Sequence, residues 1–363
     1  MAGVDGPDTG RVTCCDELTQ VSCEQEEDGM MKTNRTKGSR WCWVCVCAAF
    51  GTLFFGGAAW SEYPEKPITL YVAFDPGGPM DLGARAISMA AEKYLGKPIV
   101  VENRGGGGGT LALAVVATQK PDGYTLCAAT ATGIVRSPMM QKVPYKPLKS
   151  FTPILAYIAP HSALVVKSDA PWKNFKEFHE FAKKNPGKLN YSTTGAGSAL
   201  HHSMELIAHQ DGLKWVHVPY KGSAPAMTAL LGGHVDASAA GAEFLPYVQA
   251  GTVRALATHG EKRIVSLPDV PTLKELGYDF VNESLHSIVG PAGMPPDVSK
   301  KLENAFSKGM ESEGFKNLVQ KLEMAEVRYV GKDYDQFLKE LWGKLEKQLK
   351  ATGMIKEVAT APY

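Results

Sequence analysis

The sequence has almost no net charge. Its 363 residues include 39 Lys and Arg against 38 Asp and Glu, which leaves a formal charge of +1. A protein dedicated to nucleic acid carries a basic excess, so we expect no nucleic-acid partner. Disorder is not expected either, because 44% of the residues are hydrophobic and only 21% are charged. A chain of this length and composition can bury a sizeable core and predicts about two domains.

Cysteine is scarce beyond the first fifty residues. Six of the seven cysteines precede residue 50, and only Cys127 follows them. One thiol can form neither an internal disulfide nor a Cys-rich zinc site, so we expect neither in that part of the chain. Cys42 and Cys45 have the spacing of a redox pair, but they lie in an apolar run without a βαβ pattern. Redox chemistry is therefore not favoured.

Motifs for catalysis and nucleotide binding are largely missing. The sequence has no G-x-S-x-G, no H-E-x-x-H and no glycine loop ending in G-K-[ST]. The loop Gly105 to Gly109 departs from G-x-G-x-x-G because residue 110 is threonine. His201 and His209 lie on one predicted helix with Glu205 between them, but about 12 Å separates the two histidines along its axis. We therefore expect no cofactor and no metal.

Residues 1–61 have the pattern of an export signal. The apolar run Trp41 to Ala59 follows four basic residues and ends in small residues, as in a cleaved signal peptide. A membrane span needs about 20 apolar residues, which this run barely reaches, so we expect cleavage near Ala59 to Ser61 rather than a retained anchor. Residues 1–29 are acid-rich, which is wrong for the front of a signal. We expect translation to begin at Met30 or Met31.

From residue 62 onward, short apolar runs alternate with glycine-rich loops and helix patterns. Such alternation is typical of a parallel sheet with helical crossovers. One series starts at Ile68 and a second at about Ser162, and we expect the last stretch to complete the first series with one strand, Ser287 to Val289, followed by helices. The residues expected to share one apolar face of the first helix are Leu82, Ala86, Met89 and Ala90. The sequence predicts an α/β protein of two units, crossed near Pro160 to Val165 and again near Ser284 to Val289.

Five loops rich in Gly, Ser and Thr lie at predicted strand-to-helix junctions. They are Asp75 to Asp81, Gly105 to Thr110, Thr130 to Gly133, Thr193 to Ser198 and Tyr220 to Ser223. Such loops emerge at the carboxyl edge of a parallel sheet, where free helix-start amides can bind an anion. Neither Lys nor Arg occurs in the loops Asp75 to Asp81, Thr130 to Gly133 and Thr193 to Ser198. Lys221 is the only nearby cation. We therefore expect an anionic ligand with one or two negative charges rather than three.

An ordered set of short motifs carries a family resemblance. The motifs are Tyr63-Pro64-Glu65-Lys66-Pro67-Ile68, Pro76-Gly77-Gly78 with Asp81, Val101-Glu102-Asn103-Arg104, Pro121-Asp122-Gly123-Tyr124, Gly195-x-Gly197-Ser198 with His201 and Glu205, Val218-Pro219-Tyr220-Lys221-Gly222, Gly232-Gly233-His234-Val235-Asp236, Leu267-Pro268-Asp269-Val270-Pro271 and Gly290-Pro291-Ala292-Gly293. Together they resemble the tripartite tricarboxylate transporter substrate-binding receptors, also called the Bug family. The resemblance covers essentially the whole chain from Tyr63 to about residue 350.

The resemblance implies a two-lobed periplasmic binding protein fold of type II, with two α/β lobes, a ligand cleft and two crossover segments. Residues 62–162 and 288–363 are expected to form lobe 1 and residues 163–287 lobe 2, after an N-terminal extension and signal peptide over 1–61. The implied function is a periplasmic solute receptor, not an enzyme, that delivers a small carboxylate to a tripartite tricarboxylate-type membrane transporter. We expect a monomer. A secreted hydrolase using Ser198 and His201 on a carboxylate ester and a ligand-sensing domain remain alternatives.

Carried over by position, the loops around Pro76 and Ser198 face one another and offer amides and hydroxyls to the ligand. The expected ligand-binding residues are Phe74, Asp75, Gly77, Gly78, Met80, Asp81, Thr130, Thr132, Gly133, Thr194, Gly195, Ala196, Gly197, Ser198, His201, Tyr220, Lys221, Gly222 and Ala240. The sequence departs from the family pattern after Asp236, where relatives often place an acid in the pocket but Ala237 to Ala242 has none. Amino acids are therefore expected to bind worse than their deaminated analogues.

Overall fold

The computed structural model of the protein describes residues 62–282, 284–351 and 355. The predicted signal peptide, its cleavage site, the proposed start codons and the Cys42–Cys45 pair lie outside the described residues. Within these ranges, no helix has both the length and the apolar character that a membrane span needs.

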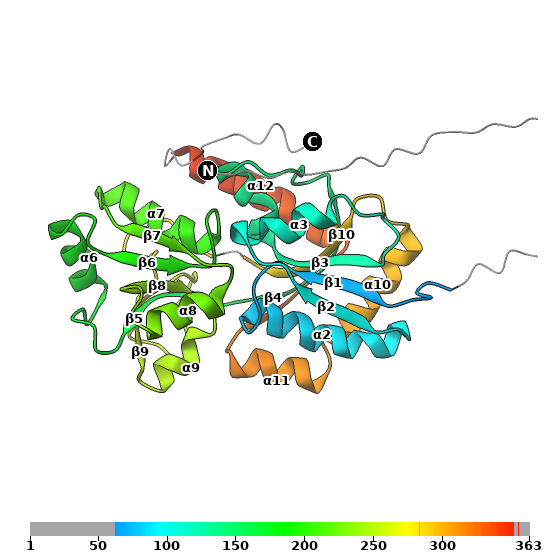
Figure 1. Cartoon of the computed structure of the whole chain (residues 1–363), viewed down its shortest axis with the longest axis horizontal. Coiled ribbons are helices and arrows are strands. Elements are labelled where there is room, and N and C mark those ends of the chain that lie inside the picture. The colour runs from blue at the N-terminus through cyan, green and yellow to red at the C-terminus, as the bar shows by residue number, and fades with distance from the viewer. Residues whose placement is uncertain (1–61, 283, 352–354, 356–363) are drawn as a thin grey trace, which may run out of the picture. The chain divides into compact units, whose positions relative to one another are not determined.

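The strands of the described residues form two sheets (Figure 1), and the first has the order β11-β4-β10-β3-β1-β2. Its strands are β1 (Ile68–Val72), β2 (Ile99–Asn103), β3 (Thr125–Thr130), β4 (Phe151–Ala159), β10 (His286–Pro291) and β11 (Ala325–Val330). β1 pairs in parallel with β2 and β3, whereas β10 is antiparallel to β3 and β4, and β11 is antiparallel to β4. Parallel strands need crossover helices, and the helix patterns between these runs supply them.

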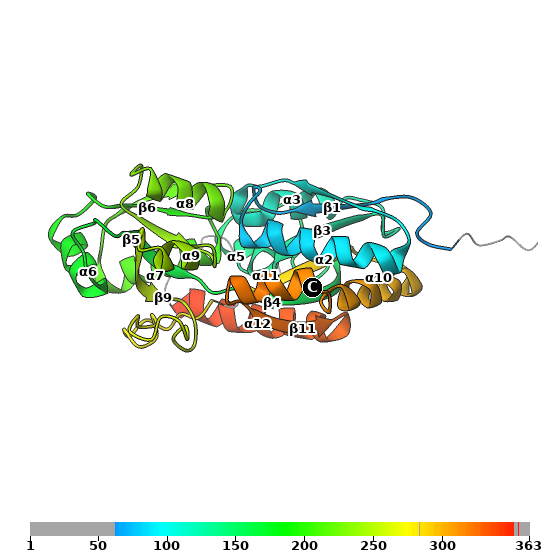
Figure 2. The same cartoon turned by 90° about the horizontal axis from the view of Figure 1, so that it is seen from below.

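Helices cover both faces of the first sheet. They are α2 (Pro79–Leu95), the 3₁₀ turn η1 (Gly107–Gly109), α3 (Thr110–Val116), α4 (Ala131–Val135), α5 (Ser137–Met140), α10 (Pro296–Gly309), α11 (Glu313–Lys321) and α12 (Lys332–Ala351). α3 and α12 lie on one side of the sheet, and α2 and α11 lie on the other (Figure 1). Figure 2 shows α2, α10 and α11 beside one another, and α2 contacts both of the others. The strands between these layers are apolar and fully buried at Leu70, Leu155 and Ile288.

The second sheet has the order β7-β6-β8-β5-β9. Its strands are β5 (Ala163–Lys167), β6 (Asn190–Thr193), β7 (Val216–Pro219), β8 (Ala237–Ala240) and β9 (Val253–Thr258), and its helices are α6 (Phe175–Lys184), α7 (Ala199–Asp211), α8 (Ser223–Leu231) and α9 (Phe244–Gln249). β6 is parallel to β7 and β8, and β5 is antiparallel to β8 and β9. α7 lies on one side of this sheet, with α8 and α9 on the other (Figure 1).

The chain crosses between the sheets twice. It leaves the first sheet after β4 and enters the second at β5, so residues 160–162 form the outward segment. It leaves β9 and returns at β10, so residues 259–285 form the return segment. The two-lobed α/β fold expected from the sequence is confirmed. The expected boundary between residues 287 and 288 falls inside β10, where His286 and Ser287 pair with strands of the first sheet. The lobe boundaries themselves stay a prediction.

Candidate functional site

A cavity lies where loops of both sheets meet the crossing segments. Its lining residues are Phe74, Gly78, Pro79, Met80, Thr130 and Thr132 from the first lobe, Thr194, Ser198, Ala199, Leu200, Ser223 and Gly241 from the second, and Pro160, His161, Ser162, Asn282, Ser284 and His286 from the crossing segments and the start of β10. The volume of the cavity is about 60 Å³. One buried water needs about 10–15 Å³ on this measure, so the cavity suits a few waters or a small organic molecule.

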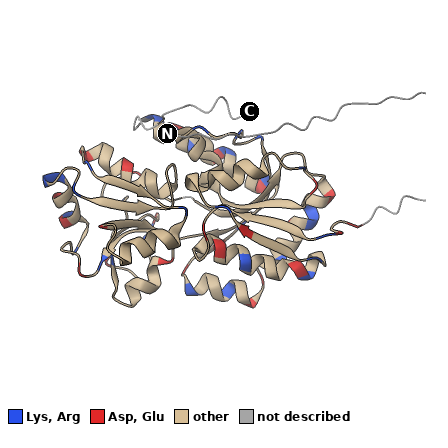
Figure 3. Ribbon diagram, in the orientation of Figure 1, with Lys and Arg blue, Asp and Glu red and all other residues tan. Residues whose placement is uncertain are grey.

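Three helices begin in the cavity wall. Pro79 is the first residue of α2, Ala199 of α7 and Ser223 of α8, and all three line the cavity. The first N–H groups of a helix lack partners within the helix, and its N-terminus carries roughly half a positive charge. The lining set contains no Lys, Arg, Asp or Glu. Figure 3 shows the charged residues mostly on the outer helices and loops, with both signs mixed. The cavity is therefore suited to an anion through dipoles and amides.

Buried hydroxyl groups line the first-lobe side of the cavity. The Thr130 hydroxyl accepts a hydrogen bond from the Gly133 N–H at 3.0 Å and so caps α4. The Thr132 and Ser284 hydroxyl oxygens are 2.6 Å apart and join α4 to the return segment. These groups provide further donors and acceptors at the point where the chain re-enters the first lobe.

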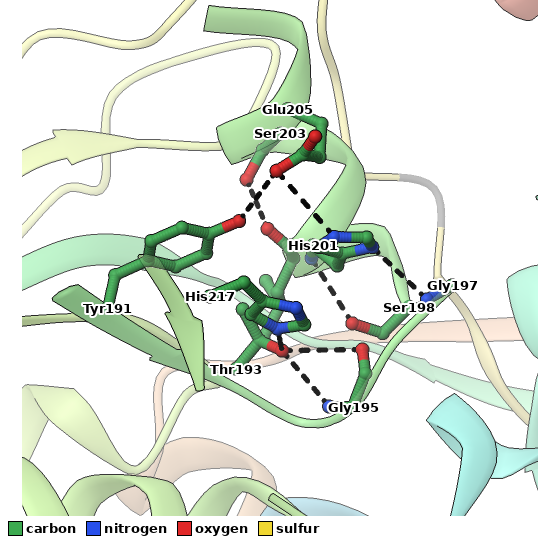
Figure 4. A network of polar contacts seen from close by, with 10 residues as sticks. Tyr191, Thr193, Gly195, Gly197, Ser198, His201, Ser203, Glu205 and His217 are labelled. Carbon is green, nitrogen blue, oxygen red and sulfur yellow. Dashed lines mark hydrogen bonds and ion pairs between the residues drawn. The ribbon is translucent and has the colours of Figure 1, made fainter. Parts of the chain in front are cut away.

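On the second-lobe side, the loop before α7 is fixed by its own polar contacts (Figure 4). The Ser198 hydroxyl caps α7 by accepting from the His201 N–H at 3.2 Å. Nδ1 of the His201 ring accepts from the Gly197 N–H at 3.2 Å, and Nε2 is 3.7 Å from a Glu205 oxygen. Both ring nitrogens thus have partners other than the Ser198 hydroxyl. This arrangement supports a helix cap rather than the activated serine of a hydrolase.

Behind this loop, the His201 ring stacks on His217 with 4.1 Å between ring centroids. His217 also contacts the Thr193 hydroxyl at 2.8 Å, and Tyr191 donates to Glu205 at 3.0 Å (Figure 4). Burial, with a smaller effect from His201, lowers the pKa of His217 to about 4. His217 is therefore neutral at pH 7 and adds no charge beside the cavity. Among the described residues, no group of three His, Cys, Asp or Glu could hold a metal ion.

The Asp81 carboxylate serves the loop before α2. Oδ2 accepts from the Gly77 N–H at 3.0 Å, and Oδ1 accepts from Arg85 at 2.9 Å and from Asn103 at 2.8 Å. Asp81 is 3% exposed and does not line the cavity. Its carboxylate therefore fixes the β1–α2 loop that carries Gly78 to the cavity wall.

Several other expected site residues lie where the two lobes touch. The Asp75 N–H donates to the Lys221 carbonyl at 2.9 Å, and the Ser137 hydroxyl donates to the Gly197 carbonyl at 3.0 Å. Gly108 also approaches the Ala196 carbonyl, which would lie 2.5 Å from a Cβ placed on that glycine. These contacts join the lobes without lining the cavity.

The expected residues therefore divide into two groups. Those in the cavity wall are Phe74, Gly78, Met80, Thr130, Thr132, Thr194 and Ser198, and those outside it are Asp75, Gly77, Asp81, Gly133, Gly195, Ala196, Gly197, His201, Tyr220, Lys221, Gly222 and Ala240. Sequence reasoning missed the contribution of the crossing segments and the start of β10, as well as Pro79, Ala199, Leu200, Ser223 and Gly241. The crossings were predicted only as links between the lobes, and a segment that joins two lobes beside their cleft can also line it.

Replacing Ser198 by alanine is expected to destabilise the protein by about 1 kcal/mol, because α7 loses its N-cap acceptor. A loss of carboxylate affinity should accompany it, since the hydroxyl lies in the cavity wall. Denaturant unfolding and calorimetry measure the two effects. Ser312→Ala is the matched control because Ser312 caps α11 in the same way, outside the cavity lining. It should cost similar stability and leave affinity unchanged; equal affinity losses in both variants would contradict the assignment.

Comparison with known proteins agrees with the two-lobed fold. Residues 83–354 match the family model described as tripartite tricarboxylate transporter family receptor. A Cupriavidus necator protein called "UPF0065 protein in gbd 5'region" is 38% identical over 295 residues, which cover 81% of this chain and 90% of that protein. The periplasmic binding protein BugD has a similar structure, with a TM-score of 0.77, 32% identity, and coverage of 81% of this chain and 100% of BugD.

Two further solved structures contain carboxylates. MatC from Rhodopseudomonas palustris with bound malate has a TM-score of 0.73 and 29% identity, covering 78% of this chain and 99% of MatC. A second R. palustris protein with adipate has a TM-score of 0.73 and 27% identity, covering 80% of this chain and 99% of that protein. The homologues are solute-binding proteins, not enzymes. The chain belongs to the family of tripartite tricarboxylate transporter receptors.

Proposed function

We propose that this protein is an extracytoplasmic receptor that binds a small mono- or dicarboxylate in the cavity between its lobes. The observation that carries the proposal is the meeting of three helix N-termini in a cavity wall without a charged Lys, Arg, Asp or Glu side chain. Each N-terminus counts as roughly half a positive charge, so the three together suit one or two carboxylates better than three. The malate and adipate in the similar structures are dicarboxylates, which supports this class of ligand.

The proposed binding site consists of the cavity-wall residues of both lobes, with the contacts around Asp75, Gly197 and Lys221 holding the lobes together over the ligand. Closure of the lobes excludes water and strengthens the hydrogen bonds to the carboxylate. The closed form is then the state that a tripartite tricarboxylate-type membrane transporter recognises. Export through the predicted signal peptide, cleaved near Ala59 to Ser61, places the receptor in the periplasm as a monomer.

Ligand binding is expected to stabilise the protein against unfolding. A ligand at 100 times its dissociation constant adds about 2.7 kcal/mol to the free energy of unfolding. Thermal unfolding with succinate, malate, adipate, benzoate, citrate and glutamate measures this, and calorimetry gives the affinities. We expect the tightest binding from a mono- or dicarboxylate without an ammonium group. Tightest binding by citrate or glutamate would contradict the predicted ligand class, and no response to any carboxylate would contradict the function.

A further inference from the structure

A carboxyl group lies directly behind the cavity wall, on Glu243 at the start of α9. Its Oε1 accepts from the Gly241 N–H at 3.2 Å. Its Oε2 is shut off from solvent and makes no hydrogen bond of good geometry. A Cβ built on Gly241 would lie 2.8 Å from Oε2 and 2.8 Å from the Ser223 hydroxyl oxygen. Because Gly241 and Ser223 both line the cavity, Oε2 lies next to the cavity at a position that any side chain on residue 241 would obstruct.

Among the described residues, no ionisable group is found to offset a charge on this carboxyl. Burial raises the pKa of Glu243 to about 7, and only the hydrogen-bonding effects of its own backbone, Ser223 and Gly241 oppose the rise. Of the ionisable groups in the cavity lining, His161 and His286 both have a pKa lowered by burial, that of His286 to about 3. Charged groups on the adjoining elements are Lys221, Arg254 and Glu323. Lys221 precedes α8, and the Arg254 guanidinium on β9 donates to the Trp172 and Ser168 carbonyls. Glu323 contacts Gln249 at the end of α9.

We propose that Glu243 takes up one proton from solvent when a carboxylate enters the cavity, so that the loaded receptor holds Glu243 as a neutral acid. The inference rests on the proposed function, since it assigns a role within the same site. A ligand carboxylate beside an ionised Glu243 would be a like-charge pair in a buried site, which favours protonation of one member. Hydronium or a protonated buffer molecule gives up the proton, so its bond to that hydrogen breaks while an O–H bond forms on a Glu243 carboxylate oxygen. The resulting O–H supplies a hydrogen-bond donor for the ligand or for Ser223.

The dissociation constant of malate should therefore depend on pH between about 6 and 9, a range in which the ligand carboxylates stay ionised. Below the pKa of Glu243 in the free protein, the proton is already bound and affinity is highest. Above that pKa, the dissociation constant should rise about tenfold per pH unit, because binding must then take up the proton. The rise should level off above the pKa of Glu243 in the complex. In Glu243→Gln the dependence should vanish, because the amide is a neutral donor at every pH.

Calorimetry in phosphate and in Tris at pH 8 measures proton uptake directly, through the different ionisation enthalpies of the two buffers. We expect up to one proton per malate for the wild-type protein and none for Glu243→Gln. Glu180→Gln on α6, where Glu180 faces Lys184 at the surface, is the matched control and should behave as wild type. If Glu243→Gln does not fold, the two-buffer measurement on the wild-type protein decides alone.

Malate binding without proton uptake would overturn the inference and leave the proposed function standing. So would an unchanged pH dependence in Glu243→Gln. Tighter binding of aspartate than of succinate at pH 9 would show that an ionised Glu243 recognises an ammonium group, and would overturn it too. Failure of every carboxylate to bind at any pH would instead overturn the proposed function, and this inference with it.

Discussion

Gly108→Ala is expected to weaken carboxylate binding by about tenfold to a hundredfold. A Cβ at residue 108 would lie 2.5 Å from the Ala196 carbonyl oxygen and 2.9 Å from the Ser198 nitrogen. Both are backbone atoms of the loop before α7, so neither can turn aside as a flexible side chain does. Overpacking of this kind costs about 1–3 kcal/mol, and here the cost falls on the contact between the lobes. Calorimetry with malate measures the affinity.

The matched control is Gly212→Ala, which separates backbone strain from the clash. Gly108 has φ +67° and Gly212 has φ +65°, so alanine is similarly unfavourable at both. Gly212 ends α7, and a Cβ there would meet no atom within 4 Å. This variant should lose stability without losing affinity. Solution scattering should show a larger radius for Gly108→Ala with malate than for wild type with malate. Equal affinity in the two variants would contradict the assigned role of the Gly108 contact.

Part of the cavity wall could be predicted from the sequence, because loops at strand-to-helix junctions of a parallel sheet bring hydroxyls and helix-start amides to one edge of the sheet. Phe74, Thr130 and Ser198 line the cavity, and their contact with a ligand stays a prediction. The position of the Glu243 carboxyl could not be predicted, since it depends on a side chain turning back toward Gly241. The stretch from Ala237 to Ala242 indeed holds no acid, but the next residue brings its carboxyl to the wall between Gly241 and Ser223.

The alternation of short apolar runs with loops and helix patterns predicted most of the strands, but it did not predict β4 and β11. β4 is a central strand of the first sheet that contains Pro153, and proline in an apolar run argues against such a strand. β11 has mostly exposed side chains and so lacks the apolar run of a buried strand. The tertiary pairing of both with the rest of the sheet outweighs these weak local signals.

The apolar face predicted for α2 is only partly the face that the protein buries, since Ala90 is 8% exposed. Leu82 and Met89 are 38% and 67% exposed, whereas Ala84, Ile87 and Ala91 are fully buried. These three share a helix face through spacings of three and four residues. A helix rich in alanine presents several faces of similar hydrophobicity, and contacts with α10 and α11 decide between them. The orientation of α2 that buries Ala84, Ile87 and Ala91 also buries Asp81, which the sequence had placed among the ligand contacts.

Asp81→Ala is expected to lower the free energy of unfolding by about 2–4 kcal/mol. The substitution removes the acceptor of the Gly77 N–H and one of the two acceptors of the Asn103 amide, which keeps the Phe74 carbonyl. A hydrogen bond to a charged group contributes about 1.5–3 kcal/mol. The Arg85 side chain is 47% exposed, so solvent can take over its charge. Arg85→Ala should accordingly cost less than about 1 kcal/mol. Denaturant unfolding of both variants measures the difference.

The same pair of variants tests whether Asp81 acts on the ligand directly or through its loop. If the carboxylate only fixes Gly77 and Gly78, Asp81→Ala should lose stability and affinity together, because the amides at the start of α2 are no longer held in the cavity wall. Asp81→Asn keeps one acceptor oxygen and should therefore lose less stability and less carboxylate affinity than Asp81→Ala. Calorimetry beside the unfolding measurements compares the two losses. An Asp81→Ala protein as stable as wild type that fails to bind any carboxylate would instead mean that the side chain contacts the ligand.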